Sequence, residues 1–287
     1  MFAINRTTMR DSYTNEDRIG DLEVSNDYLE FQLEVEDFLE GHCRLPVTFD
    51  VAQCQPPYFS EYTYNDYAGG VWVKSLSAEF NSRYLMERPK DNQGQLIFRE
   101  KYKLSPVLSD RNSEERDSLT VLFLAGTNLY DQTAWEIIDR VLYFNDNALI
   151  KPHPLTNDDG LKKLGKRYGW HHVLGPHDSG YYWFEKASSV YATANSELFV
   201  RAMLTEKYKD CLTTLNKIPR SGYFSFFILN KNGYTATEIK SAILDEASGF
   251  VFPYQTDWKN RLLCYFEKSM EFRYQFKSHV PVFIGEI

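Results

Sequence analysis

The chain has 287 residues, of which 43% are hydrophobic and 25% charged, the balance of a globular protein with a sizeable core. Its formal net charge of −8 argues against a general nucleic-acid coat protein, because neutralising phosphates takes clustered lysine and arginine. No apolar stretch approaches about 18 residues and the chain does not start like a signal peptide, so we expect a soluble, cytoplasmic protein.

The first 115 residues predict a smaller or atypical α/β domain. Residues 26–41 have the apolar spacing of a helix that ends at a glycine, and residues 44–53 and 69–76 are typical of strands. The polar segment 109–118 lacks periodicity, as linkers do. We therefore expect one domain over residues 1–115 and a second one after it.

Beyond the linker, strands and helices alternate with short connections. Residues 119–127 form a continuous apolar run, as expected of a parallel strand buried on both faces, and a helix over 131–144 follows with Asp131 as its N-cap. The pattern further predicts strands over 148–150, 171–175 and 189–194, and helices over 158–169, 181–188 and 196–206. This alternation predicts a doubly wound parallel sheet, a Rossmann-like domain over residues 116–255.

The end of the chain carries two further predicted elements. Residues 224–246 indicate a strand, a turn and a helix, and residues 257–279 form a long amphipathic segment. The four cysteines, Cys43, Cys54, Cys211 and Cys264, have no Cys-x-x-Cys or zinc-type spacing, so we predict reduced thiols and no metal site.

Three loops follow the carboxyl ends of the predicted strands, where ligands bind in a doubly wound sheet. They are Gly126-Thr127, Lys151 to Pro154, and Asn195-Ser196. We expect them to converge on one crevice. His153 lies between two prolines, which restrict the backbone, and its imidazole can donate a hydrogen bond to a phosphate oxygen. Lys151 either contributes a positive charge there or is a surface charge.

Ser196 and Glu197 open the last predicted helix of this series. Backbone N–H groups at a helix start bind phosphate, with the Ser196 hydroxyl assisting, and the Glu197 carboxylate can accept hydrogen bonds from a ribose diol. Gly126 permits close backbone approach and Thr127 adds a hydroxyl. Ser196 fits a plain N-cap equally well. No G-x-G-x-x-G or P-loop is present, which disfavours ordinary dinucleotide oxidoreductases and P-loop NTPases.

The sequence IKPHP, followed 43 positions after His153 by ATANSELFVRAML, resembles the nucleotide-binding half of GT-B glycosyltransferases. The likeness is to the His-Pro-motif bacterial sialyltransferases, polysialyltransferases and capsule-type Kdo transferases, and it covers about residues 119–210. It implies that His153 and Ser196 contact the donor phosphate, with Glu197 beside them. It also implies that residues 256–287 pack back on the N-terminal domain as a helix, and that no cofactor is needed besides the nucleotide-sugar substrate.

The catalytic base is the point at which the chain departs from these families. They carry an acidic Asp/Glu-Asp/Glu-Gly motif in the N-terminal half, whereas the only DDG here, at 158–160, follows the His-Pro turn and fits a helix start. In the N-terminal half, Asp50 and Asp66 are the two candidates for the carboxylate that takes the proton of the acceptor hydroxyl.

The sequence thus predicts a metal-independent glycosyltransferase that moves a sugar from a CMP- or UDP-sugar to a hydroxyl, with a glycan as the favoured acceptor. A phage-type enzyme acting on hydroxymethylated DNA bases is an alternative, and it would need a basic face and base flipping. Two non-enzymatic alternatives remain: a nucleotide-binding protein without transfer activity, and an α/β interaction module in which His153 is structural.

Overall fold

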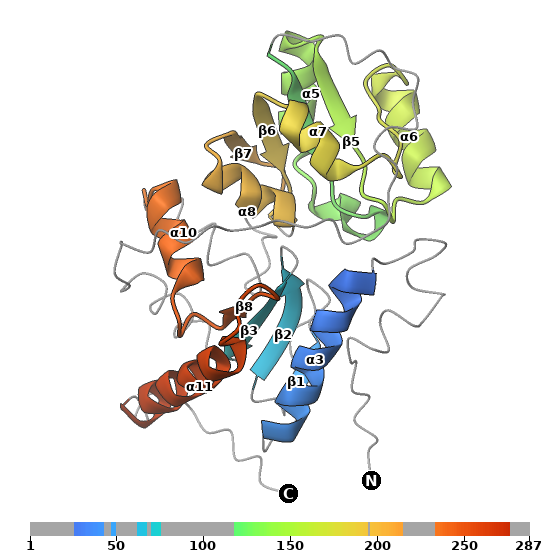
Figure 1. Ribbon diagram of the computed structural model, residues 1–287. Coiled ribbons are helices and arrows are strands. Elements are labelled where there is room, and N and C mark those ends of the chain that lie inside the picture. Colours follow the sequence, from blue (N-terminus) through green and yellow to red (C-terminus); the bar gives the residue numbers. More distant parts are fainter. Residues whose placement is uncertain are drawn as a thin grey trace, which may run out of the picture.

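The fold is mixed α/β, as the sequence predicts, with two four-stranded sheets in the described part of the chain. The computed structural model describes residues 26–42, 47–49, 62–67, 70–75, 118–194, 196–214 and 233–275. Figure 1 shows the two sheets one above the other, each with helices packed against it. Among the helices of these residues, none has the length and apolar character that crossing a membrane takes.

The first sheet is parallel throughout, which confirms the predicted parallel arrangement. In spatial order its strands are β5 (Ala148–Lys151), β4 (Thr120–Phe123), β6 (Ser189–Ala192) and β7 (Tyr208–Cys211). Phe123 is in register with Lys151 on one side and with Ala192 on the other. The carboxyl ends of β4, β5 and β6 therefore lie level at one edge of the sheet.

Strand β4 is covered on both faces by helices. These are α5 (Trp135–Phe144), α6 (Asp158–Tyr168), α7 (Gly180–Lys186) and α8 (Glu197–Leu204). Val121 and Phe123 belong to the apolar cluster with α7 and α8, whereas Leu122 and Leu124 belong to the cluster with α5 and α6. Because neighbouring residues point to opposite covered faces, the strand needs the continuous apolar run that the sequence shows.

Residues 171–175, predicted as a strand, form only a single parallel bridge between Val173 and Ile150. Backbone hydrogen bonds flank the bridge, from Ile150 N–H to His172 O (2.7 Å) and from Leu174 N–H to Ile150 O (2.9 Å). A turn before Val173 and another at Pro176 and His177 leave too few extended residues for a strand. The segment still runs beside β5, and the resulting order is compatible with a Rossmann-like sheet.

The helix predicted over 131–144 begins later, at Trp135, so Asp131 is not its N-cap. Residues Thr127–Gln132 instead form the 3-10 helix η1, and Ala134 occupies the cap position without a side-chain hydrogen bond. The Ala134 N–H donates to Leu212 O at 2.8 Å. This bond to the segment after β7 holds the chain extended between η1 and α5.

The second sheet combines strands from both ends of the chain. Its strands are β1 (Val47–Phe49), β2 (Tyr62–Tyr67), β3 (Gly70–Ser75) and β8 (Phe250–Val251), in that spatial order. Only β1 and β2 pair in parallel; β2 with β3 and β3 with β8 are antiparallel. Gly249, with φ +82°, brings β8 so close to β3 that a Cβ there would lie 2.3 Å from Val73 O.

Helices α3 (Asn26–His42) and α11 (Trp258–Gln275) pack on this second sheet. Phe31 and Val35 of α3 share an apolar cluster with Leu262 of α11 and with the valines of β3. Helix α11 thus packs against α3 and β3, elements from the first 75 residues of the chain (Figure 1).

One apolar cluster links the second sheet to the parallel sheet. Trp72 of β3 stacks on Phe250 of β8 with ring centroids 4.5 Å apart, and both belong to the cluster that contains Phe199 of α8. Helix α10 (Ala236–Leu244) contributes Ile239 to the same cluster and begins with a capping box at Thr235. Residues 109–117 of the predicted linker and the predicted strand at the start of 224–246 lie outside the described residues.

Candidate functional site

The strand order defines a topological switch point between β4 and β6. The connection from β4 leads to β5 on one side, whereas the connection from β6 leads to β7 on the other. Just beyond the strands, the Thr193 N–H still donates to Phe123 O (3.2 Å) and the Leu124 N–H to Lys151 O (3.1 Å). Ligands of doubly wound sheets bind beyond the carboxyl ends of the strands at such a switch point, which makes this edge the candidate site.

His153 is half-buried in the turn after β5, and its ring is fixed by a local hydrogen bond. The Leu155 N–H donates to His153 Nδ1 at 3.1 Å, and the Thr156 N–H donates to His153 O at 2.9 Å. Since Nδ1 acts as an acceptor, the neutral imidazole carries its proton on Nε2. The turn therefore holds His153 as an Nε2–H donor, and an imidazolium would break the bond from Leu155.

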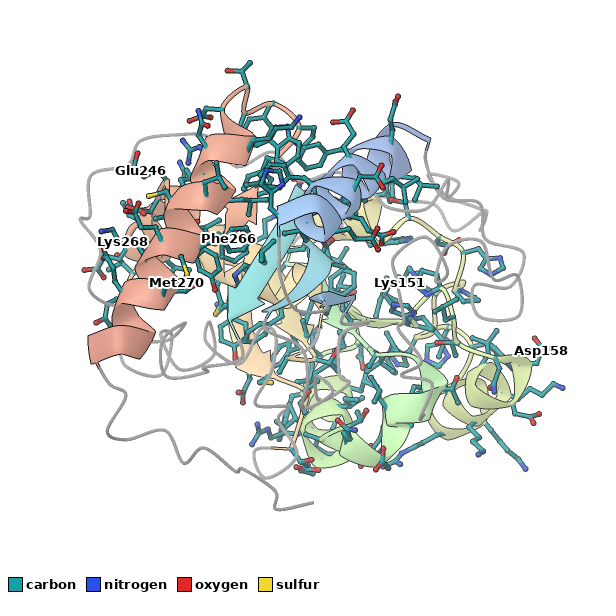
Figure 2. All side chains as sticks on the ribbon, turned by 90° about the horizontal axis from the view of Figure 1, so that it is seen from below. Lys151, Asp158, Glu246, Phe266, Lys268 and Met270 are labelled. Atoms are coloured by element: carbon teal, nitrogen blue, oxygen red, sulfur yellow. The ribbon has the colours of Figure 1, made fainter. Side chains whose placement is uncertain are left out.

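Lys151 is buried, with 2% of its surface exposed, so its interpretation as a surface charge is wrong. Its ammonium donates to Pro152 O at 2.6 Å and to Pro176 O at 2.9 Å. These bonds tie the turn that contains His153 to the loop before α7. Figure 2 shows Lys151 inside the molecule and Asp158 of α6 at its periphery. Lys151 thus helps to hold in place the turn that contains His153.

Thr127 joins the loop after β4 to the loop after β5. Its hydroxyl oxygen accepts a hydrogen bond from the Asn157 N–H at 3.1 Å, and Asn157 Oδ1 in turn caps α6 by accepting from the Gly160 N–H at 2.9 Å. Gly126 before it has φ −60° and ψ 160°, an extended conformation open to any residue. Both residues were predicted to contact a ligand, whereas the observed contact of Thr127 is with Asn157 of the protein itself.

Ser196 is the N-cap of α8, as predicted: its Oγ accepts a hydrogen bond from the Leu198 N–H at 3.2 Å. A hydroxyl that accepts one bond keeps its own proton as a donor. The negatively charged Glu197 lies in the first turn of the helix, and its Oε2 accepts from the Tyr181 hydroxyl at 3.1 Å. Tyr181 thus orients the carboxylate that sequence analysis assigned to a ribose.

Tyr181, at the start of α7, and Arg201, in the last turn of α8, were not singled out from the sequence. The Arg201 guanidinium lies 4.6 Å from the ring centroid of Tyr181 and 4.8 Å from that of Phe184, and it pairs with Glu185. Arg201 follows Glu197 by four positions, so both lie on one face of α8. This spacing of four is the sequence feature that could have identified the two residues, because it places two charges on the face of α8 that meets α7.

Three hydroxyl oxygens beyond the strand ends are buried in the described part of the chain, those of Tyr130, Thr156 and Thr193, and Thr193 Oγ1 has no hydrogen-bond partner there. They follow β4, β5 and β6 respectively. Burial raises the pKa of Tyr130, and the nearby Thr156 hydroxyl offsets part of that rise. A hydroxyl buried without a partner costs about 1–3 kcal/mol, so Thr193 lowers the stability of this edge.

The remaining predicted site residues lie elsewhere. Asn195 and Asp50 are outside the described residues, and of Asp66 only the backbone is described, in β2 opposite Val71. The segment 158–160 forms the first turn of α6, in line with the predicted helix start. Among the described residues there is no group of three or more His, Cys, Asp or Glu side chains that could hold a metal ion.

Comparison of the chain with protein-family models, with curated proteins and with solved structures finds no match in any of the three. The fold itself defines a class: a mixed α/β protein whose parallel four-stranded sheet is compatible with a Rossmann-like fold. Within that class, the loops at the carboxyl edge of the parallel sheet carry a histidine held as a donor and the start of helix α8, which are groups that suit an anionic ligand.

Proposed function

We propose that this chain is a GT-B-type glycosyltransferase that binds a nucleotide-activated sugar at the carboxyl edge of the parallel sheet. The observation that carries the proposal is the bond from the Leu155 N–H to His153 Nδ1, which makes Nε2–H the donor of that ring. His153 follows β5 and Ser196 follows β6, so their loops flank the end of the central strand β4. We expect a phosphate bound at that edge to contact both loops.

The proposed roles follow from the hydrogen-bonding state of each group. His153 Nε2–H and Ser196 Oγ–H donate to donor phosphate oxygens, and the positive end of the α8 dipole favours the same charge. Glu197, oriented by Tyr181, accepts from a sugar hydroxyl of the nucleotide. Lys151 holds the His153 turn in place through its two carbonyl contacts.

In the proposed reaction the acceptor oxygen forms a bond to the anomeric carbon while the bond from that carbon to the phosphate oxygen breaks. The electron pair goes to the nucleotide, whose growing negative charge is stabilised by the His153 and Ser196 donors. The acceptor proton goes to a carboxylate, for which Asp50 and Asp66 are the candidates. A glycan hydroxyl is the favoured acceptor, because the net charge of −8 disfavours DNA.

The proposal is tested by following nucleotide release from CMP-activated and UDP-activated sugars, with and without glycan acceptors. We expect release with one donor class. His153→Ala should lower kcat/KM by about a hundredfold, because it removes a donor to the leaving group. Asp50→Asn or Asp66→Asn should lower kcat at nearly constant KM, whereas Asp158→Asn, on the exposed start of α6, serves as the matched control.

Other outcomes point to the alternatives. Transfer to hydroxymethylated DNA but to no glycan would identify a DNA glycosyltransferase. Nucleotide binding without release from any donor would contradict the catalytic part of the proposal and favour a nucleotide-binding protein. Neither binding nor release would contradict the proposal as a whole.

A further inference from the structure

A second feature of the parallel sheet lies at its opposite, amino edge. Helices α5 and α6 cover β4 and β5 on one face, whereas α7 and α8 pack on the other. On the α5 face, a hollow of about 280 Å³ opens between the end of α5 and strands β4, β6 and β7. Thr120 and Ser189, the paired first residues of β4 and β6, line it, so it is separate from the carboxyl edge of the sheet.

Two cations line this hollow, Arg140 of α5 and Lys209 of β7. Both are exposed, and among the described residues neither forms an ion pair. The carboxylates next to them in sequence are engaged elsewhere. Asp139 accepts from Arg167 at 2.7 Å and from Tyr168 at 2.9 Å, and Asp210 accepts from the Cys211 N–H at 2.8 Å. In a chain of net charge −8, the hollow is a local positive site.

The rest of the lining combines fixed polar groups with flat apolar ones. The Asn145 amide donates to Thr120 Oγ1 at 3.0 Å, which fixes the orientation of the amide, and Ser189 lines the same hollow. Phe144 is 78% exposed at the rim, and Tyr191 is half-buried in the wall. An aromatic ring so exposed at the mouth of a hollow offers a surface on which a planar group can stack.

We propose that this hollow binds a small organic anion in which a phosphate or carboxylate is attached to a planar ring. The Arg140 guanidinium suits such an oxyanion because its fork of N–H donors matches two oxygens, and Lys209 adds a point charge. The ring of the ligand lies against Phe144. The site is independent of the glycosyltransferase proposal, because none of its residues belongs to the carboxyl edge of the sheet.

The test is isothermal titration calorimetry with phenyl phosphate, benzoate and inorganic phosphate. We expect saturable binding of phenyl phosphate or of benzoate. The compound that binds more tightly shows whether the site prefers a phosphate or a carboxylate. Arg140→Gln and Lys209→Gln should each weaken it about tenfold or more, since each removes a charge-assisted contact. Phe144→Ala should weaken binding of the ring compounds but leave inorganic phosphate unchanged.

Lys162→Gln, an exposed lysine on α6, is the matched control for loss of one charge, and it should leave the affinity unchanged. His153→Ala should also leave it unchanged, which separates this site from the proposed donor site. The absence of saturable binding to the wild type at about 10 mM ligand would overturn the proposal. Equal affinities of the wild type and both charge variants would overturn it as well.

Discussion

At the scale of single residues, the carboxyl edge of the parallel sheet contains a buried hydroxyl that reduces stability. Thr193 is 2% exposed, and its Oγ1 has no hydrogen-bond partner in the described part of the chain. Thr193→Val keeps the shape and removes the unsatisfied oxygen. We expect the free energy of unfolding to rise by about 1 kcal/mol, measured by urea denaturation.

Thr213 supplies the matched control, because its equally buried hydroxyl accepts a hydrogen bond from the Ala194 N–H at 3.0 Å. Thr213→Val leaves that N–H without a partner and should lower the free energy of unfolding by about 1–2 kcal/mol. Equal losses in both variants would mean that the Thr193 hydroxyl is satisfied in solution.

At the scale of elements, the junction of η1 with α6 depends on a glycine. A Cβ at Gly160 would lie 2.7 Å from Thr127 Oγ1, and that hydroxyl is held by the Asn157 N–H. Gly160→Ala should therefore destabilise the protein by about 1–3 kcal/mol, although alanine is the better helix former. Thermal unfolding of the single and double variants with Thr127→Ala checks this.

In the Thr127→Ala background the two closest contacts of the added Cβ are gone, and Asn157 Oδ1 at 3.2 Å is the nearest atom left. There Gly160→Ala should be neutral or stabilising by up to about 1 kcal/mol. A stabilising effect of Gly160→Ala in the wild-type background would contradict the close contact between the two elements.

Secondary structure was predictable from the sequence where the elements are local, and mispredicted where they depend on distant partners. The run 119–127 identified β4, because alternate residues meet two different helix layers. Strand β8 has two residues and exists only through its pairing with β3. Strand β7 was missed because its sequence YKDC is half charged, as an edge strand allows.

The candidate site was predictable to the same extent. The predicted strand ends placed His153 and Ser196 in loops at one edge of the sheet, because alternating strands and helices make the strands parallel and parallel strands end at the same edge. Lys151 is buried where its ammonium reaches Pro176, 25 positions further along the chain. The bond from Tyr181 to Glu197 likewise joins residues 16 positions apart. No local pattern specifies such contacts, so these positioning roles required the structure.

At the scale of the whole molecule, the buried thiol of Cys211 predicts sensitivity to alkaline pH. Burial raises the pKa of Cys211, so the folded state keeps a proton that the unfolded chain loses above its ordinary pKa of about 8.5. The free energy of unfolding should therefore fall as pH rises from about 8.5 towards the folded-state pKa. Burial likewise raises the pKa of Tyr208 and Tyr168, which extends the fall above about pH 10.

Urea denaturation between pH 7 and 10 checks this expectation. Cys211→Ala should make the fall with pH shallower, because it removes one of the groups that drive it. Cys264→Ala is the control: the pKa of that thiol is also raised by burial, but Cys264 is more exposed, so its replacement should change the slope less. A slope unchanged in Cys211→Ala would contradict the assignment.

The assignment of the carboxyl edge as a nucleotide site is tested most directly by thermal unfolding in the presence of CMP, UMP, UDP, GDP and ADP. We predict that CMP or UDP raises the melting temperature of the wild type, since a ligand bound only by the native state stabilises it by mass action. The rise should vanish in His153→Ala and persist in His171→Ala, a histidine in the turn after α6. No rise with any nucleotide, or a rise that survives in His153→Ala, would contradict the assignment.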